Sequence, residues 1–135
     1  MDISHIEHIG VAVKNLDEAV SFYENVLGLK CYRVEQVEEQ KVKTAFFKIG
    51  NTKIELLEST EPEGPIGKFI EKKGEGIHHI SFAVKDIKKS LNEVESKGIR
   101  LINKEPVPGA ENMLVSFLHP KSTFGVLTEL CQQRE

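Results

Sequence analysis

The sequence predicts an α+β fold built from two tandem βαβββ modules. The stretch "IEHIGVAVKNLDEAV" from Ile6 to Val20 recurs as "IHHISFAVKDIKKSL" from Ile77 to Leu91. In both copies the residue types first alternate, which is typical of a strand, and apolar residues then recur at i, i+3 and i+4, which is typical of a helix. A strand-turn-strand pattern follows later in each half. We therefore expect one supersecondary unit to occur twice in the chain.

The first module covers about residues 4–58. Its helix is expected to begin at about Asp17 and to stop at Gly28, because glycine often follows the last turn of a helix. The stretch "AFFKIGNTKIELLE" at 45–58 predicts a hairpin with a Gly-Asn turn. The helix is expected to face a sheet with its apolar residues Ala19, Val20, Tyr23, Val26 and Leu27.

Residues 59–76 form a Pro- and Gly-rich connection, with a short helix expected near Ile66–Lys73. The second module follows at about 77–131, and we expect the whole chain, 1–135, to form a single domain.

The second module repeats the pattern of the first. Its helix is expected from about Asp86 to Gly98, with Ile87, Leu91 and Val94 facing a sheet. Residues 114–130 predict a second hairpin with a longer turn around Pro120.

The alternation along the two leading strands separates their histidines. His8 shares a strand face with Gly10 and Ala12, and His79 shares one with Ser81 and Ala83. The small neighbours leave space above these faces and predict a cleft into which both histidines point. His78 lies on the opposite, bulky face, where packing under a helix is expected.

Two glutamates occupy matching positions on the last strand of each module. Aligning "KIEL" (53–56) with "LTEL" (127–130) places Glu55 on Glu129. A lone strand histidine is more often a hydrogen-bonded core residue than a ligand, but an ionised carboxylate is costly to bury without a partner. Two imidazole nitrogens and two carboxylate oxygens suit a divalent first-row metal with open positions for a substrate.

The composition restricts the class of protein. Of the 135 residues, 39% are hydrophobic and 29% charged, as in ordinary soluble globular proteins. A net charge of −3 favours neither nucleic acid nor an anionic membrane as a partner. Cys31 and Cys131 lie far apart and predict no disulfide framework. No secretory signal or membrane span is evident, so we expect a cytoplasmic protein.

Four stretches resemble the vicinal oxygen chelate (glyoxalase/bleomycin resistance/dioxygenase) superfamily and, within it, the methylmalonyl-CoA epimerase family. They are "HIGVAVKNLDEAVSFYENVLGL" (8–29), "EEQKVKTAFFKIGNTKIELLE" (38–58), "PIGKFIEKKGEGIHHISFAV" (65–84) and "FLHPKSTFGVLTEL" (117–130). The resemblance implies a U-shaped mixed β-sheet around a metal site, with the helices on the outside.

The resemblance also implies the site residues. One divalent metal ion per chain is expected. Cobalt is the expected ion, and manganese, nickel and zinc are alternatives. The family's catalytic glutamate that is not a metal ligand matches Glu39, although shifting the alignment to the family motif by one residue would place Glu38 there. Glu129 is expected to act in catalysis as well as in metal binding. The chain departs from the family pattern at Phe124, where a glycine is expected before Gly125. The ligand positions match His8, Glu55, His79 and Glu129.

The implied reaction interconverts (2R)- and (2S)-methylmalonyl-CoA by removal of the α-proton through a metal-stabilised enolate. The expected partner is a small acyl-CoA, but the sequence assigns no residue to the CoA moiety. The repeat indicates modules that pair either within the chain or across a dimer and does not decide between them; we also expect a homodimer. Two alternatives share the fold: a glyoxalase-type isomerase (lactoylglutathione lyase) and a non-catalytic module that binds small molecules.

Overall fold

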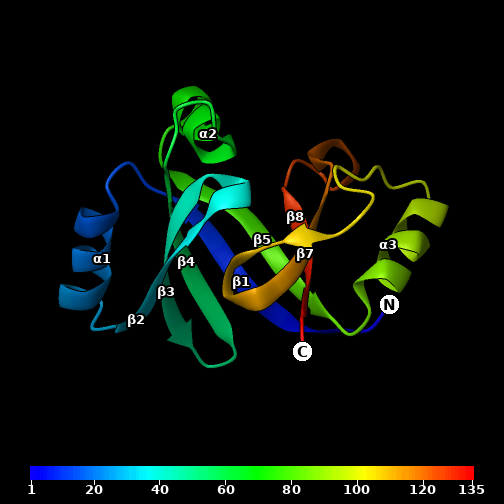
Figure 1. The fold of residues 1–135 in the computed structure, drawn as a ribbon, viewed down its shortest axis with the longest axis horizontal. Helices are drawn as coiled ribbons and strands as arrows, with labels where there is room; N and C mark the ends of the chain where they lie inside the picture. Colours follow the sequence, from blue (N-terminus) through cyan, green and yellow to red (C-terminus); the bar gives the residue numbers. More distant parts are fainter. The chain divides into compact units, whose positions relative to one another are not determined.

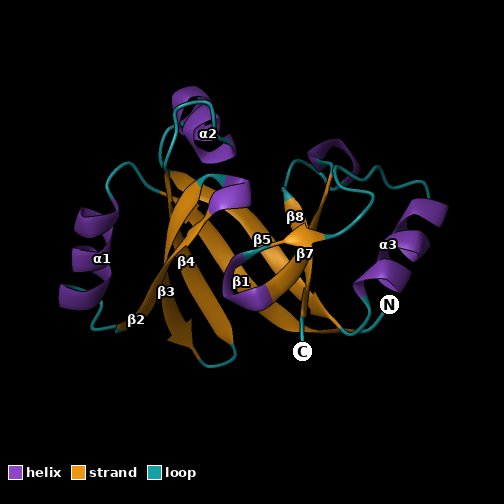
Figure 2. Cartoon of the chain, in the orientation of Figure 1, coloured by secondary structure: helices purple, strands orange, loops and turns teal.

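The computed structural model describes residues 1–135, and the chain folds as two compact units (Figures 1 and 2). One unit contains His8–His78, and the other combines Met1–Glu7 with His79–Glu135. The prediction of one domain over 1–135 stays a prediction.

The unit of residues 8–78 contains the connecting helix and the first βαβββ module, except for residues 3–7 of its leading strand, which belong to the other unit. The strands of this first module follow the order β2-β3-β4-β1. Strand β1 pairs with β4 in parallel, whereas β3 pairs with both β2 and β4 in antiparallel fashion. The predicted hairpin is β3–β4, with Gly50 in its turn at φ 59°. The elements are β1 (Ile3–Ala12), α1 (Leu16–Asn25), β2 (Cys31–Val37), β3 (Val42–Ile49), β4 (Thr52–Ser59) and α2 (Pro65–Lys73).

Helix α1 packs on one face of this sheet (Figure 1). The Asn15 side chain caps its N-terminus by accepting a hydrogen bond from the Glu18 N–H at 3.0 Å. Leu16, Ala19, Val20 and Tyr23 contact a core that includes Ala45, Phe47 and Leu56.

The prediction that Val26 and Leu27 face the sheet is wrong. Val26 is 68% exposed and Leu27 is 52% exposed. The helix ends at Asn25 and Val26 is its C-cap, so neither residue continues the helical periodicity.

The other unit contains the second module, except for residues 76–78 of its leading strand. Its strands follow the order β5-β8-β7-β6, with β5 parallel to β8 and β7 antiparallel to both of its neighbours. The module thus repeats the pairing of the first, in which the leading strand lies parallel to the last. The elements are β5 (Gly76–Val84), α3 (Ile87–Ser96), β6 (Val107–Pro108), β7 (Met113–Leu118) and β8 (Thr128–Gln133).

Helix α3 covers one face of the second sheet segment. The predicted face is confirmed, because Ile87, Leu91 and Val94 form a buried cluster with Val84, Leu118 and Leu130. Asp86 caps the helix by accepting a hydrogen bond from the Lys89 N–H at 3.1 Å. The two helices therefore shield equivalent faces of the two modules, and the α+β class and the paired βαβββ organisation are confirmed.

Two connections complete the fold. The predicted short helix is α2, whose Phe69 ring contacts the His78 ring edge-on at a centroid distance of 4.9 Å. This packing role for His78 agrees with the expectation from alternation. The longer turn between β7 and β8 contains a 3-10 helix, Pro120–Ser122, followed by Phe124 and Gly125, both with positive φ. None of the helices is both long and apolar enough to cross a membrane.

Candidate metal centre

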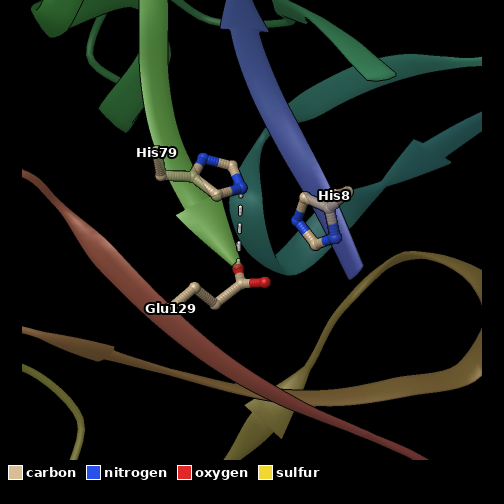
Figure 3. A group of neighbouring side chains, drawn as sticks. All are labelled: His8, His79 and Glu129. Carbon is tan, nitrogen blue, oxygen red and sulfur yellow. Dashed lines mark ion pairs between the residues drawn. The ribbon is translucent and has the colours of Figure 1, made fainter. Parts of the chain in front are cut away.

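In the second module, a histidine and a glutamate meet on neighbouring parallel strands. His79 on β5 and Glu129 on β8 are 5% and 3% exposed. His79 Nε2 lies 3.8 Å from Glu129 Oε1, and Figure 3 shows the ring directed at the carboxylate. Residues that are buried together in this way must satisfy each other or a shared ligand.

The strand register identifies the face on which this pair lies. Phe82 pairs with Leu130, and both contact the cluster under α3. Ser81 pairs with Glu129 one residue earlier, so its side chain points to the opposite face. His79 lies two residues before Ser81 and shares that face. The His79–Glu129 pair therefore lies on the side of the sheet away from α3.

An aromatic ring holds the His79 imidazole in place. Phe117 on β7 pairs in register with Glu129, and its ring meets His79 edge-on at a centroid distance of 5.5 Å. Edge-to-face packing of this kind restricts the rotation of both rings. The imidazole is thus ordered on one side by a ring and on the other by a carboxylate.

The first module contains the equivalent pair. His8 Nδ1 on β1 lies 3.1 Å from Glu55 Oε2 on β4, and the residues are 4% and 6% exposed. Gly10 is the register partner of Glu55, so the histidine again lies two residues before the partner of the glutamate. The duplicated sequence has therefore folded into two matching buried His/Glu pairs.

Both pairs have the chemistry of metal ligands, and their donor atoms lie at or near the spacing expected for two ligands on one ion. Ligand bonds of about 2.0–2.2 Å place two donor atoms on one ion about 3.0–3.5 Å apart. The 3.1 Å of the first pair lies within this range, and the 3.8 Å of the second exceeds it by only a few tenths of an ångström. Imidazole nitrogen and carboxylate oxygen suit divalent first-row metals. Each pair thus fits half of a mixed nitrogen–oxygen site.

The predicted catalytic glutamate lies elsewhere on the first module. Glu38 and Glu39 are both exposed in a 3-10 turn, Glu38–Gln40, between β2 and β3. Glu38 Oε1 accepts a hydrogen bond from Gln36 Nε2 at 3.0 Å. The turn is ordered, since the Lys41 N–H donates to the Glu38 carbonyl at 3.2 Å. The role of Glu39 stays a prediction.

Three further residues near the pairs were not singled out from the sequence. Glu7 on β1 is only 5% exposed. It aligns with His78 in the repeat, and a charged residue in an apolar strand was the available signal. Phe117 looked like an ordinary strand residue, and alternation placed Ser81 on the face of His79 without giving it a role. Their importance depends on strand register, which a single sequence does not provide.

The chain matches a family model over most of its length. The model of the Glyoxalase/Bleomycin resistance protein/Dioxygenase superfamily matches residues 7–117. The chain belongs to this superfamily.

Relatives and solved structures narrow the class further. The mitochondrial methylmalonyl-CoA epimerase of Homo sapiens is 37% identical, over 97% of this chain and 75% of its own. The ethylmalonyl-CoA/methylmalonyl-CoA epimerase of Cereibacter sphaeroides is 37% identical, over 96% of this chain and 98% of its own. A Streptomyces coelicolor methylmalonyl-CoA epimerase, solved with 2-nitronate-propionyl-CoA, is 38% identical and covers 98% of this chain and 96% of its own, with a TM-score of 0.95. Within the superfamily, the chain falls among the methylmalonyl-CoA epimerases.

Proposed function

We infer that this chain interconverts (2R)- and (2S)-methylmalonyl-CoA. Full-length similarity to the epimerases supports the substrate, and the chemistry of the buried residues supports the reaction. The observation of greatest weight is the repetition of a buried His/Glu pair at equivalent strand positions in both modules. Burying two such pairs in an apolar fold costs free energy, and binding a common ligand would offset that cost. No observation favours the glyoxalase-type isomerase or the non-catalytic module.

We propose that His8, Glu55, His79 and Glu129 together hold one divalent metal. The matching burial and donor spacing of the two pairs support this assignment. Cobalt is the expected ion, with manganese, nickel and zinc as alternatives compatible with the same donors. When bound, the metal would act as a Lewis acid toward the thioester oxygen and so favour loss of the α-proton.

The chain's own carboxylates supply the proton transfers. The α-carbon lies between a thioester and a carboxylate, and inverting it requires a base on one face and an acid on the other. We propose Glu39 and Glu129 as these two groups, one ionised and one protonated at the start of each turnover. The ionised carboxylate removes the α-proton and leaves a planar enolate. The protonated carboxyl group delivers a proton to the opposite face of the enolate. The two groups exchange roles in the reverse reaction.

Deuterium exchange tests the proposed activity. The purified protein is incubated with one epimer of methylmalonyl-CoA in deuterated water, and mass spectrometry and chiral analysis follow the α-position. We expect deuterium uptake together with loss of stereochemical purity, both abolished by a chelator and restored by cobalt. A fully metallated protein that exchanges no α-hydrogen would contradict the assignment.

The role of Glu39 has a direct test in a conservative substitution. Glu39→Gln removes the proton acceptor but preserves the size of the side chain. We expect turnover to fall by about 100-fold or more, as for loss of a general base, with metal content unchanged. Glu38→Gln, one residue away on the same turn, is the matched control and should retain activity. If Glu38→Gln is the inactive variant, the two roles are exchanged.

Two further proposals concern the setting of the protein. We propose a homodimer, because repeated modules can pair across a dimer as well as within a chain, and a cytoplasmic location. Light scattering during size-exclusion chromatography tests the assembly, with twice the chain mass expected. Elution at the mass of one chain would overturn the homodimer. Fractionation of the source cells tests the location.

A further inference from the structure

The Ser81 side chain is a buried polar group without a hydrogen-bond partner. The residue is 0% exposed, and its Oγ atom forms no hydrogen bond in the structure. Most buried hydroxyl groups are paired, because an unpaired one loses its hydration without compensation. Ser81 therefore lowers the stability of the fold unless its hydroxyl binds something in another state of the protein.

The strand register places this hydroxyl beside a proposed metal ligand. Ser81 on β5 is the direct register partner of Glu129 on β8. Side chains of directly paired residues lie on the same face of the sheet, and neighbouring strands run about 4.7–4.9 Å apart. Ser81 also lies two residues after His79, on the same face. A change of the Ser81 χ1 rotamer moves the hydroxyl without moving the backbone.

Comparison of the two modules shows that this hydroxyl is present in only one of them. The register partner of Glu55 in the first module is Gly10, which has no side chain. The His/Glu distances differ as well, at 3.1 Å in the first module and 3.8 Å in the second. The second module thus has the looser pair and, beside it, the extra donor.

We propose that Ser81 is a positioning residue that donates a hydrogen bond from its Oγ–H to the Glu129 carboxylate when Glu129 binds metal. This inference rests on the proposed function. Carboxylates that ligate metals are commonly held by such outer hydrogen bonds, and loss of one typically weakens metal binding by about 10- to 100-fold. Ser81 would orient Glu129 so that one carboxylate oxygen faces the metal, which matters because Glu129 is also proposed to move a proton.

The test separates metal affinity from folding. Cobalt dissociation constants and melting temperatures of the metal-free proteins are measured for the wild type, Ser81→Ala and Ser81→Cys. We expect Ser81→Ala to bind cobalt at least about 10-fold more weakly while its metal-free melting temperature stays the same or rises. Ser81→Cys, of similar size but a poor donor, should also bind cobalt weakly. If it behaves like the wild type, Ser81 acts by filling space and the proposal fails.

Two matched controls come from other buried hydroxyl groups. Ser116, 0% exposed, donates from Oγ to the Asn103 carbonyl at 2.6 Å, so Ser116→Ala should lower the melting temperature and leave cobalt affinity unchanged. Thr44 is 1% exposed with an unpartnered Oγ1 and lies on the same face as Glu55, the register partner of Phe46, but the direct partner of Thr44 on β4 is the apolar Leu57. Thr44→Val should therefore change neither cobalt affinity nor exchange.

The outcomes distinguish the two proposals. Wild-type cobalt affinity in Ser81→Ala would overturn the role of Ser81 and leave the proposed function intact. A melting temperature lowered as in Ser116→Ala would show that the hydroxyl serves the metal-free fold, which also overturns the role. A wild-type protein that binds no divalent metal would instead remove the proposed metal site itself.

Discussion

Phe124 has a backbone conformation that phenylalanine rarely adopts. Its φ is 58°, and its side chain is fully exposed at 101%. The loop is closed around it, since the Gly125 N–H donates to the Pro120 carbonyl at 2.8 Å. The aromatic side chain therefore gains little from packing, while the left-handed backbone costs about 1–2 kcal/mol. The departure from the family pattern seen in the sequence is thus a local strain in the turn before β8.

Replacing Phe124 with glycine should stabilise the protein. Phe124→Gly removes the left-handed strain, and the greater freedom of glycine in the unfolded chain offsets part of the gain. We expect an increase of about 0.5–1 kcal/mol in the free energy of unfolding, measured by urea denaturation. Gly125→Ala, at φ 86°, is the matched control and should be destabilising. A less stable Phe124→Gly would show that the ring makes a stabilising contact.

At the scale of elements, helices α1 and α3 each begin at a side-chain cap on the residue before the first turn. The Asp86 carboxylate accepts a hydrogen bond from the Lys89 N–H, and the Asp86 carbonyl accepts one from the Ser90 Oγ at 2.8 Å. These contacts fix the first turn of α3 and the angle at which the chain leaves β5. The buried face of α3 follows, with Ile87 directly after the cap.

Removing the cap should weaken the second module. We expect Asp86→Ala to lower the free energy of unfolding by about 1 kcal/mol, because the helix N-terminus loses an acceptor. Asp86→Asn keeps the acceptor and should stay within a few tenths of the wild type. Chemical denaturation of both variants checks this, and an unaffected Asp86→Ala would mean that the cap contributes nothing to stability.

Much of the element pattern could be predicted from the sequence, because alternation and helical periodicity are local. The strands around His8 and His79 followed from bulky residues alternating with small ones. The burial of Glu55 and Glu129 followed from a charged residue within an apolar strand. The extent of α1 could not be predicted, since Val26 and Leu27 fit the helical pattern but lie beyond the last turn. Predicting the neighbours of Glu129 would also have required the strand register, which depends on residues far apart in the chain.

At the scale of the whole molecule, duplication would explain how one short motif can form the proposed four-ligand site. Each module contributes one imidazole and one carboxylate from parallel neighbouring strands. A single pair binds a divalent ion weakly, because it supplies only two donors. Two modules in one chain supply four, and the intramolecular arrangement removes the entropic cost of bringing separate chains together.

Metal binding should therefore stabilise the folded chain. Cobalt at 100 times its dissociation constant is expected to add about 2.7 kcal/mol to the free energy of unfolding. The stabilisation should fall as the solution is acidified, since histidine and carboxylate ligands must lose their protons to bind. Thermal unfolding with and without cobalt across a pH series checks this. Calcium, which prefers oxygen ligands, is the control and should shift the melting temperature less. An equal shift by both ions would indicate binding elsewhere.

Anomalous diffraction from crystals of the cobalt-loaded protein tests the central claim most directly. The claim is that the two His/Glu pairs bind the same ion. We expect one anomalous peak per chain, within bonding distance of nitrogen atoms of His8 and His79 and of carboxylate oxygens of Glu55 and Glu129. A peak bonded to only one pair, or located away from both pairs, would contradict it.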